Sequence, residues 1–165
     1  MLYKAFKLIF LFVLGTVCHW AFATFFSFCG LSVNMMLVFA IAVCTVVPLE
    51  AGYLVAFFSG LFLDFFGARL FGNNAFLFTL AACAVYALRE RIDFEAVVPQ
   101  MVTVFLLTCT VGISNSLLVA WFTSFSQWPG LWSLLGGAVV GTFFAPFVFW
   151  LVRRVWGEET APARL

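Results

Sequence analysis

Long apolar stretches separated by short polar breaks run through the whole chain. A membrane-spanning helix needs about 20 mostly apolar residues, and six stretches approach that length. The breaks between them contain glycine, proline or charged residues, which end helices or are costly inside a bilayer. The pattern therefore predicts an all-α fold, a polytopic transmembrane six-helix bundle forming a single integral membrane domain, residues 1–165. The predicted spans cover residues 6–28, 33–47, 50–66, 73–88, 97–122 and 131–152.

Composition excludes most other classes of protein. Of the 165 residues, 65% are hydrophobic and only 9% are charged, whereas soluble domains contain about 25% charged residues. A soluble domain of this size cannot bury so much apolar surface in one core. With a net charge of +1, the chain also lacks the basic face that a nucleic-acid-binding protein uses. We therefore expect membrane lipid around the chain and no nucleic acid partner.

The basic residues predict the orientation of the six spans. An even number of spans places both termini on one side, and that side collects seven of the eight basic residues, leaving Arg69 on the other. Cytoplasmic loops carry the excess of Lys and Arg in membrane proteins, so both termini are expected to be cytoplasmic. The seven residues are Lys4, Lys7, Arg89, Arg91, Arg153, Arg154 and Arg164.

The sequence offers few groups for catalysis. Its single histidine, His19, lies inside the first predicted span, and no carboxylate is near it in the sequence. No HExxH, GxSxG or P-loop pattern occurs. The five cysteines stand singly in apolar sequence without a CxxC pair, which is typical of packing residues. We therefore expect no enzymatic activity, no catalytic residues, no metal site and no cofactor.

The third predicted span carries the most informative pattern. Gly52, Ala56, Gly60 and Asp64 recur every four residues, which places them on one face of a helix. Small residues at this spacing let another helix backbone approach closely, and membrane helices associate in this way. This small-residue stripe predicts either helix packing within the bundle or a site for another subunit or a ligand.

A second group of polar residues follows the stripe at the outer end of the third span. Asp64 is followed by Arg69, Asn73 and Asn74. Asp64 is expected to pair with Arg69, the one basic residue on that side, or to hydrogen-bond Asn73 or Asn74. In the alternative interpretation, the four side chains form an outer-face polar site.

Two further features lie in the last two spans. Asn115 stands in apolar sequence, and an unpaired amide inside a membrane is costly. It is therefore expected to bond another helix in preference to a ligand. Gly137 and Gly141 form a GxxxG pattern, which predicts a close helix–helix or partner contact in the sixth span.

The segment from Glu50 to Asp93 resembles the central stretch of the MreD family, the bacterial rod shape-determining membrane proteins. The likeness is carried by the pattern G…GxxxD…G over Gly52–Gly67, followed by Leu70-Phe71-Gly72-Asn73-Asn74-Ala75. It covers about a quarter of the chain, and the rest agrees with the family in length, six spans and the position of the charged loop. Asn115 departs from the family pattern, because some relatives carry an acidic residue there.

The resemblance implies a non-enzymatic subunit of the elongasome, the complex that builds the lateral cell wall at the bacterial inner (cytoplasmic) membrane. Members of the family are thought to associate with MreC. Through MreC they reach the actin-like MreB and the peptidoglycan synthase made of RodA and a class B penicillin-binding protein. The implied helical arrangement is similar to the substrate-binding subunits of energy-coupling factor transporters. A small solute-binding transporter subunit, with Asp64, Arg69, Asn73 and Asn74 lining its pocket, is therefore the alternative function.

Overall fold

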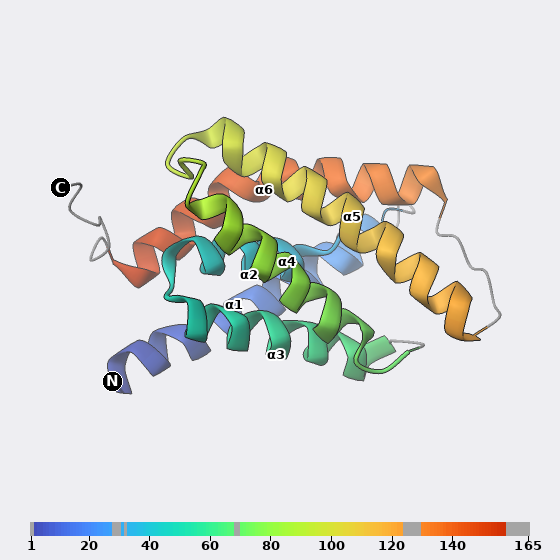
Figure 1. The fold of residues 1–165 in the computed structure, drawn as a ribbon, viewed down its shortest axis with the longest axis horizontal. Coiled ribbons are helices and arrows are strands. Elements are labelled where there is room, and N and C mark those ends of the chain that lie inside the picture. The colour runs from blue at the N-terminus through green and yellow to red at the C-terminus, as the bar shows by residue number, and fades with distance from the viewer. Residues whose placement is uncertain (1, 28–30, 32, 68–69, 124–129, 158–165) are drawn as a thin grey trace.

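The computed structural model describes residues 2–27, 31, 33–67, 70–123 and 130–157, and these residues form an all-α bundle (Figure 1). The predicted fold class is confirmed in this respect. Six helices follow one another in the described part of the chain. They are α1 (Leu2–Ser27), α2 (Met35–Val46), α3 (Leu49–Gly67), α4 (Asn73–Arg89), α5 (Val97–Thr123) and α6 (Leu131–Trp156).

Helix α2 is the centre of the bundle. All 12 of its residues are buried, and each of the other five helices contacts it. A helix that is apolar on every side is typical of a position where protein or lipid surrounds it completely. It begins after Asn34, whose side chain accepts a hydrogen bond from the backbone N–H of Leu37 at 3.2 Å. It ends before Pro48, which cannot continue a helix without losing a hydrogen bond.

Within the described residues, four helices are long and apolar enough to cross a membrane. They are residues 5–26 of α1, and α3, α5 and α6. This set indicates a multi-pass membrane protein. The second predicted span differs from the structure, because α2 has 12 residues and rises about 18 Å, whereas the hydrocarbon core is about 30 Å thick. Helix α4, with 17 residues, is at the lower limit of a spanning helix. The six-span topology therefore stays a prediction.

The outward faces of the bundle are covered by large apolar side chains. Trp121 is 85% exposed and Trp132 is 79% exposed, and exposed phenylalanines are found on all of the longer helices. Soluble monomers rarely expose continuous apolar surface on this scale. Tryptophans near helix ends are typical of the two membrane–water interfaces. The surface therefore fits a lipid environment.

The two ends of the described chain lie at the same end of the bundle (Figure 1). Lys7 Nζ donates a hydrogen bond of 2.7 Å to the carbonyl oxygen of Trp156, which ties the start of α1 to the last turn of α6. Helix α6 continues to Trp156, four residues beyond the predicted limit of the sixth span. Arg153 and Arg154 are therefore helical residues.

Candidate functional site

The small-residue stripe of α3 lies inside the bundle. Gly52, Ala56, Gly60 and Asp64 are all buried, and the contacts below place Gly52, Gly60 and Asp64 against α4. The sequence left open whether this face packs within the bundle or forms a site for another subunit or a ligand. In the structure it packs within the chain. Another subunit would have to displace α4 to reach the stripe.

Gly60 lies where the backbones of α3 and α4 approach each other closely. A Cβ atom on Gly60 would lie 2.4 Å from the carbonyl oxygen of Asn74 and 2.5 Å from Cα of Ala75. These neighbours are backbone atoms, which cannot move aside as a flexible side chain can. The close approach brings Asp64, one turn further along α3, within reach of the start of α4.

Asp64 binds the N-terminus of α4. Its Oδ1 accepts hydrogen bonds from the backbone N–H of Asn74 at 3.1 Å and from the Asn74 side-chain amide at 3.0 Å. Its Oδ2 accepts a hydrogen bond of 3.1 Å from the backbone N–H of Ala75. First-turn N–H groups have no partner within their own helix, and Gly72, which precedes α4, provides no side-chain cap. Asp64 therefore supplies the N-cap of α4 from α3.

The polar residues at this end form two separate pairs. Asp64 binds Asn74, whereas the side-chain amide of Asn73 donates to the Oδ1 of Asn115 on α5. Asn115 therefore has a helix–helix partner, as the sequence suggested. Arg69 lies outside the described residues, so its pairing with Asp64 stays a prediction. The three described residues of the predicted outer-face site bind one another or α5.

The other end of α4 is also tied to its neighbours. A Cβ atom on Gly52 would lie 1.8 Å from the hydroxyl oxygen of Tyr86, so Gly52 provides the space that this side chain occupies. The hydroxyl lies 3.1 Å from the carbonyl oxygen of Val47 and 3.2 Å from that of Pro48. Arg89 Nη1 donates to the same Val47 oxygen at 3.1 Å. The α3–α4 hairpin is thus held at both ends.

Sequence reasoning did not identify Tyr86 and Arg89 as structural residues. The available signal was Pro48, because it ends α2 and leaves carbonyl groups near the turn in need of donors. Tyr86 and Arg89 are three residues apart, which places them on neighbouring positions of one helix surface. Their side chains donate hydrogen bonds to the carbonyl groups of the turn between α2 and α3.

The loop between α4 and α5 closes the end of the bundle that carries both termini. Phe94 is buried, and its carbonyl oxygen accepts a hydrogen bond of 2.7 Å from Gln100 Nε2. Arg153 of α6 donates to the same oxygen. The loop is thereby fixed to α5 and α6.

Both glycines of the GxxxG pattern, Gly137 and Gly141, are buried in α6. A Cβ atom on Gly141 would lie 3.4 Å from a methyl group of Val38 on α2. This face of α6, which includes Gly137, therefore belongs to the interior of the bundle. The neighbouring Gly112 of α5 receives the side chain of Leu134, whose Cδ1 lies 2.2 Å from the position of an added Cβ.

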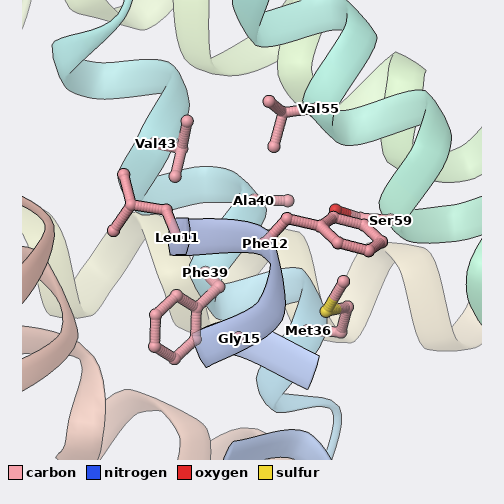
Figure 2. A pocket seen from close by; sticks show the side chains of 9 residues that line it. All are labelled: Leu11, Phe12, Gly15, Met36, Phe39, Ala40, Val43, Val55 and Ser59. Carbon is pink, nitrogen blue, oxygen red and sulfur yellow. The ribbon is translucent and has the colours of Figure 1, made fainter. Parts of the chain in front are cut away.

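A small cavity lies between α1, α2 and α3 (Figure 2). Its lining is apolar apart from the hydroxyl of Ser59, and its volume is about 10 Å³, room for about one water molecule. This cavity is too small for a vitamin-sized solute. The lining residues are Leu11, Phe12, Gly15, Met36, Phe39, Ala40, Val43, Val55 and Ser59.

No metal-binding cluster is found in the part of the chain that the structure describes. There, no group of three or more His, Cys, Asp or Glu residues could hold a metal ion. His19 Nδ1 is buried and has no hydrogen-bond partner among the described residues. The arrangement found at Asp64, Gly60 and Tyr86 serves helix packing.

These features define the class of the protein as a multi-pass α-helical membrane protein with a tightly fastened α3–α4 hairpin. Comparison with protein-family models, curated proteins and solved structures finds no match for the chain. A more specific function therefore rests on the residues of the chain and on the resemblance carried by α3 and α4.

Proposed function

We propose that this protein is a non-enzymatic membrane subunit of the bacterial cell-wall elongation complex, similar to MreD. In this proposal it supports rod shape and lateral peptidoglycan synthesis by associating with MreC at the inner membrane. One observation carries the proposal. The residues on which the resemblance depends, above all Gly60 and Asp64, are those that fasten α3 to α4.

A structural role for these residues suits an interaction subunit. Such a protein needs a stable shape that presents helix faces to its partners, and the α3–α4 fastening provides a rigid part of that shape. Helices α1 and α5 bury few of their residues, so much of their apolar surface remains available to a membrane helix of MreC or to lipid. MreB, RodA and the class B penicillin-binding protein would then be reached directly or through MreC.

The alternative of a solute-binding transporter subunit receives less support. Its pocket would need polar groups that face a common space, whereas Asp64 binds Asn74 and Asn73 binds Asn115. The Asp64 carboxylate already accepts three hydrogen bonds, so it has little capacity left to bind a solute. The cavity between α1, α2 and α3 is apolar and very small.

Depletion of the protein in its rod-shaped host tests the proposal. We expect the cells to become round and lateral wall synthesis to fall, with rescue by the wild-type chain. Normal rods that lose uptake of a vitamin would contradict the proposal and favour the transporter subunit.

Affinity purification from native membranes in mild detergent provides a second, independent test. The proposal expects MreC and cell-wall synthesis proteins in the purified complex. A transporter ATPase module in their place would contradict it.

The requirement for the α3–α4 hairpin is tested with Gly60→Leu. Gly67→Leu is the matched control for this substitution, because an added Cβ at Gly67 would meet nothing within 4 Å.

A further inference from the structure

The charged residues at the end of the bundle that carries both termini fall into two regions. The first consists of Lys7 on α1 and Arg153 and Arg154 on α6, and neither helix contains an acidic residue. The second contains the carboxylates, which are exposed beside the start of α3 and in the loop after α4. These carboxylates are Glu50, Glu90, Asp93 and Glu95. The first region, here called the basic seam, lies where α1 meets α6 and carries only positive charges among the described residues. The α3–α5 side of the same end carries charges of both signs.

Two cations of the basic seam are held beside aromatic rings. Lys7 Nζ lies 4.6 Å from the centre of the Tyr3 ring and uses one hydrogen bond on the Trp156 carbonyl. The Arg154 guanidinium lies 5.5 Å from the centre of the Trp150 ring. Cations positioned in this way lose less conformational freedom when they bind an anion.

Both cations retain hydrogen-bonding capacity. An ammonium group has three donors and a guanidinium has five. Lys7 uses one donor in a hydrogen bond, and Arg154 makes no hydrogen bond or ion pair with the described residues. Arg153 differs, because it donates to the carbonyl oxygen of Phe94. Among the described residues of the seam, Arg154 and Lys7 therefore have hydrogen-bond donors available for an anion.

Arg154 lies at the polar end of an apolar, outward-facing row on α6. Phe143, Phe147 and Trp150 are exposed, and their spacing of three to four residues places them on one face with Arg154. On the contacting helix α1, Tyr3 and Phe6 are also exposed. An aromatic row that ends in a cation is typical of a helix crossing from acyl chains into headgroups.

We propose that Arg154 binds the phosphate of an anionic phospholipid whose acyl chain lies along the aromatic row of α6, and that Lys7 on the contacting helix adds positive charge at the same end of the bundle. Arginine matches phosphate oxygens with a pair of parallel hydrogen bonds. Basic sites between membrane helices bind anionic headgroups, and each cation close to the membrane surface strengthens this attraction. The site does not depend on the proposed function.

Native mass spectrometry of the purified full chain in detergent tests this site. The chain is titrated separately with dioleoylphosphatidylglycerol and dioleoylphosphatidylcholine, which have the same acyl chains. We expect the wild type to retain the anionic phosphatidylglycerol in preference to phosphatidylcholine. Arg154→Gln should lower affinity for phosphatidylglycerol about fivefold and leave phosphatidylcholine binding unchanged. Adding Lys7→Gln to Arg154→Gln should lower the affinity for phosphatidylglycerol further, although Lys7→Gln also removes the hydrogen bond to Trp156.

Arg91→Gln is the matched control. Arg91 is an exposed arginine at the same end of the bundle, in the loop that contains Glu90 and Asp93. Its substitution removes the same charge and should leave lipid preference unchanged. An equal loss in Arg91→Gln and Arg154→Gln, or no lipid preference in the wild type, would overturn the proposal. Glu158 and Glu159 follow α6 in the sequence. If phosphatidylglycerol binds only the double variant Glu158→Gln, Glu159→Gln, the proposal is also overturned, because carboxylates of the chain would then occupy the site.

Discussion

The carboxylate of Asp64 on α3 accepts a hydrogen bond from the backbone N–H of Ala75 on α4, at 3.1 Å. The N–H of Asn74 binds the other oxygen of the same carboxylate. One side chain of α3 thus satisfies two first-turn donors of the neighbouring helix, which would otherwise be unpaired in an apolar environment. The geometry of the α3–α4 hairpin therefore depends on this carboxylate.

Asp64→Asn is expected to destabilise the protein. Asparagine has one acceptor oxygen in place of two, and its NH₂ group would face an N–H of Asn74 or Ala75. Loss of an N-cap costs about 1 kcal/mol, and an unsatisfied buried donor adds about 1–3 kcal/mol. The free energy of unfolding, measured by denaturant titration in mild detergent, should fall accordingly. An unchanged free energy would contradict the cap.

A double-mutant cycle with Arg69 separates the cap from the ion pair predicted from the sequence. If Asp64 acts mainly as the cap of α4, Arg69→Gln should lower stability equally in the wild type and in Asp64→Asn. If the two charges act as one unit, the second substitution should add little. The four unfolding free energies of this cycle decide between the two relationships.

Gly60→Leu is expected to separate α3 from α4. The new Cβ would lie 2.4–2.6 Å from backbone atoms of Asn74 and Ala75, so the whole hairpin must shift to accept it. Overpacking of this kind costs about 1–3 kcal/mol, and it also moves Asp64 away from the N–H groups that it binds. The thermal unfolding midpoint in detergent should fall clearly.

Gly67→Leu is the control for this substitution, because a Cβ at Gly67 meets no atom within 4 Å. Its unfolding midpoint should equal that of the wild type or exceed it. Equal midpoints for Gly60→Leu and Gly67→Leu would contradict the close backbone contact.

The positions of most helices follow from the apolar pattern alone. Apolar runs of about 20 residues have few alternatives to a helix in a membrane, and α3 and α4 begin and end within one residue of their predicted limits. Helix α1 begins four residues before its predicted span and α6 ends four residues after its own. Helix α2 is shorter than predicted. It begins at Met35, two residues later than predicted, because Asn34 caps it.

The partners of the polar residues were harder to predict. A four-residue spacing on α3 identifies a face of the helix and leaves open which helix covers it. Asp64 was expected to pair with Arg69 or to hydrogen-bond Asn73 or Asn74, and the Asn74 side chain is one of its partners. Its other partners are backbone N–H groups, which every residue except proline possesses. Asn115 binds Asn73, 42 residues away, and such a distant pairing leaves no local sequence pattern.

Reporter fusions test the predicted orientation of the helices. Fusions after Arg91 and after Arg154 should both report the cytoplasm, because both follow helices that end at the basic side of the bundle. A fusion at Gln127, between α5 and α6, should report the outside. A periplasmic signal at either arginine would contradict the six-span topology, in which α4 crosses the membrane despite its 17 residues.

Gly52 and Tyr86 provide the last test of how α4 is held. In Gly52→Ala the new Cβ would lie 1.8 Å from the hydroxyl oxygen of Tyr86, so the hydroxyl would be driven from the carbonyl groups of Val47 and Pro48. Tyr86→Phe alone removes this hydrogen bond and should cost about 1 kcal/mol. With the oxygen gone, the closest atom of the ring is 2.8 Å from the added Cβ. Gly52→Ala should therefore cost less in the Tyr86→Phe protein than in the wild type.

The coupling energy between these two substitutions should be about 1 kcal/mol, as found for residues in direct contact. It is obtained from the unfolding free energies of the wild type, the two single variants and the double variant. Gly67→Ala combined with Tyr86→Phe is the control and should be additive, because an added Cβ at Gly67 would meet no atom within 4 Å. Additive losses for Gly52→Ala and Tyr86→Phe would mean that Gly52 does not provide the space for Tyr86. The hydrogen bonds at the α2–α3 turn would then depend on some other feature of α4.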